Sequence, residues 1–247
     1  GLIVINVSIP SIGNSFNSGK NFYSSKSGQI DYSSASKLVE TQSQDMIERV
    51  EQIEKHVDDN RLNEAKNKLT KAQNSCTNQN DPEVTKQAMD DVQEAKKMLA
   101  QTRKDHLKTI RQMELDNTVE FYEDLISKYA KPIEQNKFDN LRRSAQRAID
   151  DKSNDFESYL DEIKQLNFDI LWNQDWFVVD KFKNFAESPY LFSDKNEFQQ
   201  LVNAGMIAMK SDDINKLRQI IALMYAIKIG SSSQDDIFAS SNIIRGH

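Results

Sequence analysis

The first stretch whose residue types could do chemistry is a glycine-containing segment with a lysine near its end, Gly13 to Asn21. A phosphate-binding loop needs four residues between its two glycines, so that successive backbone N–H groups surround the phosphate. It also needs a serine or threonine after the lysine for magnesium. Here five residues separate Gly13 from Gly19, and Asn21 follows Lys20. We interpret the segment as a loop without a nucleotide-binding role.

A second candidate is a set of oxygen-bearing side chains with the spacing of a calcium loop. Asp151, Ser153, Asp155 and Glu162 fall at positions 1, 3, 5 and 12 of that template. The template needs glycine at position 6 for its sharp turn, and this chain has Phe156 there. Because the same residues suit a helix cap and an acidic first turn, we do not predict calcium binding.

The chain has few soft metal ligands: Cys76 and the histidines His56, His106 and His247. None of them is paired at the spacing of a zinc finger or of two ligands on one helix face. Cys76 lies on an apolar helical face, where a buried small side chain is the usual role. A single cysteine excludes an internal disulfide and fits a reducing compartment, so we expect a cytoplasmic protein. With no catalytic constellation, we expect no enzyme activity, metal or cofactor in this chain.

The least ordinary feature is a run of aromatic side chains between residues 168 and 192. Within it we single out Trp172, Trp176, Phe177 and Phe182 as candidate partner-binding residues. One interpretation is the core of a C-terminal domain, because large aromatic side chains are normally buried. The other is a groove or exposed anchor for an apolar segment of a partner, where Trp and Phe often dominate binding. Trp176 and Phe177 are adjacent and cannot both face one side of a helix.

Helices must hold these candidates, and the longest predicted helix spans Asp81 to Tyr129. Asp81 can cap it, and Pro82 suits its first turn. Apolar or small residues then recur every three or four positions, which makes one stripe on a helix, and Asp116–Thr118 are placed to bend or split it. A helix this long cannot bury its stripe alone. The helices on either side must therefore pack against it.

The pattern as a whole predicts an all-α fold, a helical bundle with helical hairpins, and a short β segment at the N-terminus. The hairpin is predicted at 194–229, where two apolar stripes are joined by a short turn. We divide the chain into the terminal strands of a truncated β unit at 1–32, helices that include the long one at 33–131, a C-terminal helical module at 132–230 and a tail at 231–247.

Composition favours a protein-binding role over other classes. The 247 residues carry a net charge of -6, with 38% hydrophobic and 28% charged residues, a balance typical of amphipathic helices. Seven glycines and four prolines are few for a sandwich or barrel with many turns. A negative chain has no general attraction for nucleic acid or anionic lipid, and no stretch approaches the roughly 20 apolar residues that span a bilayer.

The N-terminal residues resemble one known family. Gly1–Ser8, with the sequence GLIVINVS, looks like a late strand in the peptide-binding β unit of DnaK-type (heat-shock seventy) chaperones, and Gln29–Tyr32 looks like the final strand before the helical lid. The charged helix that contains Leu62–Ala65 is similar to that lid. The resemblance covers residues 1–75. It implies the C-terminal part of such a chaperone, cut within or just before a strand, with a further domain before it.

In that family an ATPase domain opens and closes a lid over an extended apolar peptide. The resemblance implies that this chain is the lid and protein-interaction region, that it contacts unfolded polypeptide or a co-chaperone, and that the ATPase lies elsewhere. Residues 132–230 depart from a compact lid and imply an added helical module. The alternative is a helical adaptor or scaffold, in which the hairpin at 194–229 docks a specific protein partner.

Overall fold

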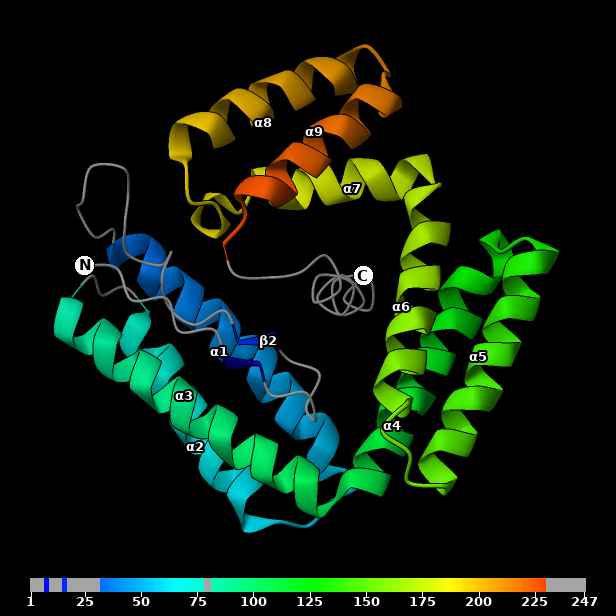
Figure 1. The fold of residues 1–247 in the computed structure, drawn as a ribbon. Helices are drawn as coiled ribbons and strands as arrows, with labels where there is room; N and C mark the ends of the chain where they lie inside the picture. The colour runs from blue at the N-terminus through cyan, green and yellow to red at the C-terminus, as the bar shows by residue number, and fades with distance from the viewer. Residues whose placement is uncertain (1–6, 9–14, 17–31, 78–80, 230–247) are drawn as a thin grey trace.

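The computed structural model describes residues 7–8, 15–16, 32–77 and 81–229 (Figure 1). Nearly all of these residues are helical, which confirms the predicted all-α fold. The α-helices are α1 (Tyr32–Glu54), α2 (Asn60–Cys76), α3 (Pro82–Asp105), α4 (Leu107–Phe121), α5 (Pro132–Asp150), α6 (Phe156–Trp172), α7 (Asp175–Ala186), α8 (Lys195–Lys210) and α9 (Ile214–Ile227). A π-helical turn, η1 (Tyr122–Ile126), and two 3-10 turns, η2 (Ser127–Tyr129) and η3 (Pro189–Leu191), join some of them.

Before α1, two short strands form an antiparallel ladder. They are β1 (Val7–Ser8) and β2 (Ser15–Phe16), with Val7 opposite Phe16. The β unit predicted at 1–32 stays a prediction, because nearly all of it lies outside the described residues, and β2 lies in the segment that we interpret as a loop. Tyr32 is an exception, because it begins α1 instead of ending a strand.

The helix starts follow the capping residues that the sequence shows. Asp81, predicted as the cap of the long helix, accepts from the backbone N–H groups of Glu83 and Val84 at 2.8 and 3.2 Å. Pro82 occupies the first turn behind it. Asp194 caps α8 in the same way. These side chains satisfy N–H groups that have no partner within their own helix.

The predicted long helix is wrong in one respect, because it breaks at His106. Asp116–Thr118, the predicted bend, lie inside α4. His106 has φ -114° and ψ 32°, outside the helical range, and its Nε2 atom lies 3.2 Å from Oδ2 of Asp59 in the connection between α1 and α2. The chain therefore changes direction one turn before the residues that α4 contributes to the core.

The physical reason for the break is that α4 serves two hydrophobic cores. Ile110 and Met113 pack with α1, α2 and α3, whereas Leu115 and Phe121 pack with α5 and α6. If α3 continued straight into α4, the apolar residues of α4 would lie along one line and could not pack into both cores. The turn at His106 lets neighbouring faces of α4 meet different partners.

Buried apolar side chains form three clusters, which divide the helices into three units. The first unit is α1–α3 (residues 32–105), the second is α4–α6 (residues 107–172), and the third is α7–α9 (residues 175–227). The division predicted between residues 131 and 132 falls inside the second unit.

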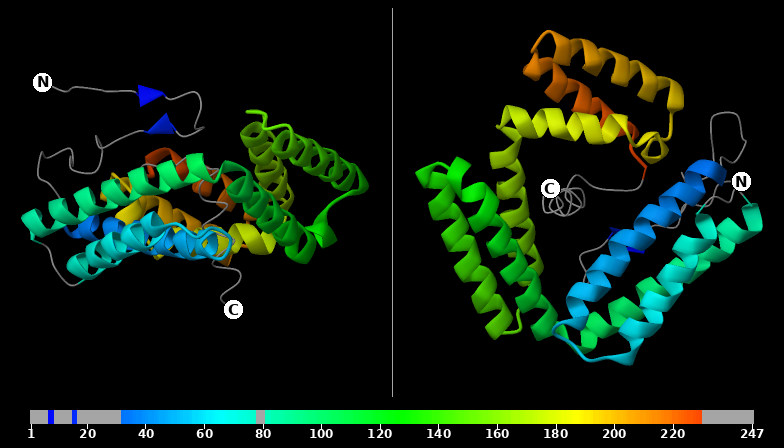
Figure 2. Two further views of the ribbon diagram at one scale, coloured as in Figure 1. Left: turned by 90° about the horizontal axis from the view of Figure 1, so that it is seen from below. Right: turned by 180° about the vertical axis from the view of Figure 1, so that it is seen from behind.

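The three units lie like the sides of a triangle (Figure 1), and the view from below in Figure 2 shows that they share one layer. The first unit meets the second where α3 passes into α4. The second meets the third where α6 passes into α7. The third unit returns to the first through η3, which contacts α1.

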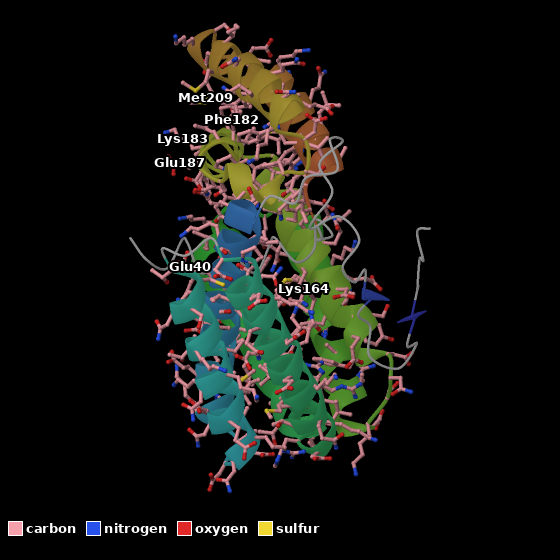
Figure 3. All side chains as sticks on the ribbon, turned by 90° about the vertical axis from the view of Figure 1, so that its left-hand side faces the viewer. Glu40, Lys164, Phe182, Lys183, Glu187 and Met209 are labelled. Atoms are coloured by element: carbon pink, nitrogen blue, oxygen red, sulfur yellow. The ribbon has the colours of Figure 1, made fainter. Side chains whose placement is uncertain are left out.

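Phe182, one of the predicted binding residues, is the centre of the third unit. Its ring is fully buried. A methyl group at Gly205 of α8 would overlap the ring atoms Cε2, Cζ and Cδ2 of Phe182. Figure 3 labels Phe182 on α7 below Met209 of α8. Gly205 therefore brings α8 close to α7 because it has no side chain there.

We expect Gly205→Ala to destabilise the protein although alanine is the better helix former. Alanine in place of glycine in a helix contributes about 0.5–1 kcal/mol. Overpacking a core costs about 1–3 kcal/mol, and the buried ring of Phe182 has little room to move. Urea unfolding should show a net loss of about 1 kcal/mol or more in the free energy of unfolding. The control Asn203→Ala, on the exposed side of α8, should show no loss. An unchanged value for Gly205→Ala would contradict this packing.

Candidate functional site

The structure separates the four predicted binding residues into buried and exposed positions. Phe177 is buried in the second cluster, and Phe182 is buried in the third. Trp172, at the end of α6, is partly buried and packs against both clusters. Trp176 is 39% exposed. Trp176 and Phe177 therefore take different sides of α7, one exposed and one buried, as the helical spacing predicts.

Trp176 is the exposed end of a chain of aromatic contacts that leads into the interior. Its ring centroid lies 6.0 Å from that of Tyr129 in η2 and 5.8 Å from that of Phe177. Phe168 continues the chain, at 6.1 Å from Phe177 and 5.4 Å from Trp172. Edge-to-face and offset contacts at these distances are favourable for aromatic rings. The exposed tryptophan is thus held from behind by other rings.

Further exposed apolar side chains lie on α8 and α9. Met206 and Ile207 belong to α8, Leu223 belongs to α9, and Ile207 is 68% exposed. Together with Trp176 they make four of the five strongly exposed large apolar side chains in the described residues, and the fifth is Ile133 of α5. Sequence analysis missed Met206, Ile207 and Leu223 because it followed only the buried stripes. All three are apolar residues outside the buried stripes, and this position could have predicted their exposure.

A network of charged side chains lies where the first unit meets the second. Glu114 of α4 accepts through Oε1 from Arg49 of α1, at 3.1 Å, and from Arg103 of α3. The other carboxylate oxygen of Glu114, Oε2, is buried without a hydrogen-bond partner among the described residues. One carboxylate therefore ties α4 to two helices of the first unit.

Arg103 continues the network to a second carboxylate, Glu157 of α6, at 3.3 Å. Glu157 also accepts two hydrogen bonds from Arg111 of α4, at 3.0 and 2.6 Å. Arg111 is only 4% exposed. It donates to the carbonyl of Ser153 at 2.8 Å and lies over the ring of Phe156, 5.2 Å from its centroid. The network thus joins α1, α3, α4 and α6.

The electrostatics of this network are those of a mutually neutralised cluster. Burial alone would raise the pKa of the Glu114 carboxyl, but Arg103 and Arg49 hold that pKa below its ordinary value. Burial lowers the pKa of Lys164 on α6, although Asp161 and Glu114 partly offset this effect. Taking charges out of water is costly, and removing one partner of such a set leaves the others unpaired. We interpret the network as structural, because its carboxylates are engaged with arginines.

Metal-binding residue patterns do not converge in the described part of the chain. No group of three or more His, Cys, Asp or Glu residues there could hold a metal ion. Of the calcium-template residues, Asp151 is the C-terminal cap just after α5, and the Ser153 hydroxyl donates to Asp155 at 2.8 Å. Glu162 lies within α6. Cys76 is buried in the first cluster, and burial raises the pKa of its thiol.

Comparisons with known proteins do not identify a function for this chain. No protein-family model, no curated protein and no solved structure matches the chain. The helices in the described ranges are each too short or too polar to cross a lipid bilayer.

We expect Glu114→Gln to lower the free energy of unfolding by about 3 kcal/mol, because Arg49 and Arg103 would then face a neutral amide. A carboxyl with a depressed folded-state pKa contributes its stability above its unfolded-state pKa, here 4.5. That contribution is lost as the pH falls through the folded-state pKa. Urea unfolding at several pH values should therefore show the largest difference from the wild type above pH 4.5 and a smaller one in acid.

The matched control is Glu123→Gln, which removes a carboxylate of η1 that pairs with Arg142 at the surface, at 3.2 Å. An exposed pair of this kind contributes at most about 1 kcal/mol. Equal losses of unfolding free energy for the two variants would contradict a stabilising role for the buried network. A loss for Glu114→Gln that does not change with pH would contradict it as well.

Proposed function

We propose that this protein is the helical lid and protein-interaction region of a DnaK-type chaperone, and that its third unit binds apolar segments of unfolded polypeptide. The resemblance of Gly1–Ser8 and Gln29–Tyr32 to the end of the peptide-binding β unit supports the family. The observation that carries the binding role is the concentration of exposed apolar side chains on α7–α9.

The exposed residues have the properties of binding anchors. Large apolar side chains lose contact with water when a partner covers them, and tryptophan recurs at the centres of protein interfaces. Trp176 presents a ring that Tyr129 and Phe177 hold in place, so little side-chain freedom is lost when a partner binds. Ile207 and Leu223 add aliphatic surface on the two helices of the hairpin.

The proposed mechanism is conformational and involves no covalent change in the bound polypeptide. Helix α1 would connect the peptide clamp that precedes it to the helical units, which then cover or contact the non-native chain. The charged network at Glu114 would set the angle between the first and second units and so the position of the third. In this proposal the protein works in the cytoplasm beside an ATPase domain.

A second candidate is a helical adaptor that docks one specific folded protein. The observation in its favour is that α7–α9 have a hydrophobic cluster of their own, centred on Phe182, as a docking module needs. The two candidates differ in the partner. A chaperone region accepts many unfolded sequences, whereas an adaptor discriminates against them.

Binding of a fluorescein-labelled apolar peptide, followed by anisotropy, tests the proposal. We expect saturable binding with Kd on the order of micromolar, as is usual for such peptides. Ile207→Ser and Leu223→Ser should each weaken binding roughly tenfold, because burying such a side chain contributes about 1.5–3 kcal/mol. Both residues are exposed, so neither change should alter the fold.

Ile133→Ser is the matched control, because Ile133 is also exposed but lies outside the third unit. Its affinity should equal that of the wild type. Equal weakening by Ile133→Ser and Ile207→Ser would show that binding is non-specific. If the peptide and a permanently unfolded protein both fail to bind, the adaptor role is favoured over the chaperone role.

A further inference from the structure

The contact between the third unit and α1 has a different character from the other two junctions. The hydroxyl groups of Thr41 in α1 and Tyr190 in η3 form a hydrogen bond of 3.3 Å, which is long for two hydroxyls. No residue of η3 is buried. Among the described residues, no hydrophobic cluster contains residues of both the first and the third unit.

A weak electrostatic interaction also links α1 to the chain just after α9. The pKa of Asp45 in α1 is raised to about 6, because surrounding protein atoms and Glu48 disfavour its charged form, while Lys228 after α9 acts in the opposite direction. The Asp45 side chain keeps contact with solvent. The attraction between Lys228 and this solvent-exposed carboxyl is screened by water, so it contributes little to stability.

The other two junctions are held more firmly. The first and second units share the buried network of Glu114 and Arg111. The second and third units share Trp172, which packs against both of their clusters. Arg218 of α9 also donates to the carbonyl of Trp172 in α6 at 3.2 Å, and Asp175 of its own unit accepts from the same guanidinium at 2.9 Å.

The η3 turn belongs mechanically to the third unit. The backbone N–H of Ile229, just after α9, donates to the carbonyl of Leu191 at 2.8 Å. The N–H of Ser193 donates to the carbonyl of Ile227 at 3.0 Å. Figure 3 shows the end of α7, marked by Lys183 and Glu187, above the end of α1 that carries Glu40. If the third unit moves away from α1, Tyr190 must leave with it.

We propose that the triangle of helical units opens and closes at the contact between α1 and η3, with the Thr41–Tyr190 hydrogen bond as its latch. A small contact without a shared apolar core has a low free-energy cost of opening, as expected for local opening in proteins. Opening exposes Thr41, which is partly buried in the contact, and leaves each of the three clusters intact. This inference concerns conformation only and does not depend on the proposed chaperone function.

Distance measurement between two spin labels tests the latch in the whole chain. One label is placed at Gln87 on α3 and one at Gln200 on α8, both exposed, after Cys76→Ala removes the native thiol. We expect two distances in the wild type. Thr41→Val and Tyr190→Phe should each raise the population at the longer distance, relative to that at the shorter distance, roughly fivefold. That shift is the effect of losing one hydrogen bond.

The double variant makes the test specific. Both changes remove the hydrogen bond between Thr41 and Tyr190, and Thr41→Val also removes the one from the Thr41 hydroxyl to the carbonyl of Lys37 within α1, at 3.0 Å. Thr41→Val combined with Tyr190→Phe should therefore open the triangle no further than Thr41→Val alone. Tyr159→Phe removes a tyrosine hydroxyl from the second unit and should leave the ratio unchanged. A single distance that neither latch variant alters would overturn the proposal, and so would an equal response to Tyr159→Phe. Circular dichroism verifies that every variant remains folded.

Discussion

Two arginines from different helices share one buried carboxylate, Glu114, and the arrangement of the chain depends on that contact. The helix that carries Glu114 begins just after the break at His106, so its direction decides where the second and third units lie. Burial makes the carboxylate expensive, and the arginines offset that cost only in one geometry. A polar cluster of this kind contributes less to total stability than an apolar core of the same size, but its hydrogen bonds join helices of the first and second units.

The sequence predicts the helices better than their grouping. Asp81 and Pro82 mark the start of α3 because capping and proline preferences are local properties of the chain. The break at His106 is not local. It arises because Ile110 and Leu115, five positions apart, belong to different cores, and periodicity alone cannot say which core a stripe meets. The ion network was missed for the same reason, since Arg49 and Glu114 are 65 residues apart.

The candidate binding residues show a related limit. Residue type predicts that Phe177, Phe182 and Trp176 are important, but burial sorts them into core and surface. Phe182 is fixed by Gly205, a residue whose missing side chain gives no signal in a search for apolar patterns. Trp176 is exposed because its neighbour Phe177 takes the buried side of the same turn. The sequence predicts that Trp176 and Phe177 lie on different sides of their helix. It does not predict which of the two is buried.

Both tryptophans of the chain, Trp172 and Trp176, lie at the corner between α6 and α7, and the first unit contains none. Tryptophan fluorescence therefore reports on this corner and not on α1–α3, whereas far-ultraviolet circular dichroism reports on all the helices. Unfolding followed by the two signals distinguishes one cooperative molecule from separable parts without any added label. Coincident transitions would mean that the units unfold together in a single cooperative event. Displaced transitions would mean that the first unit melts by itself.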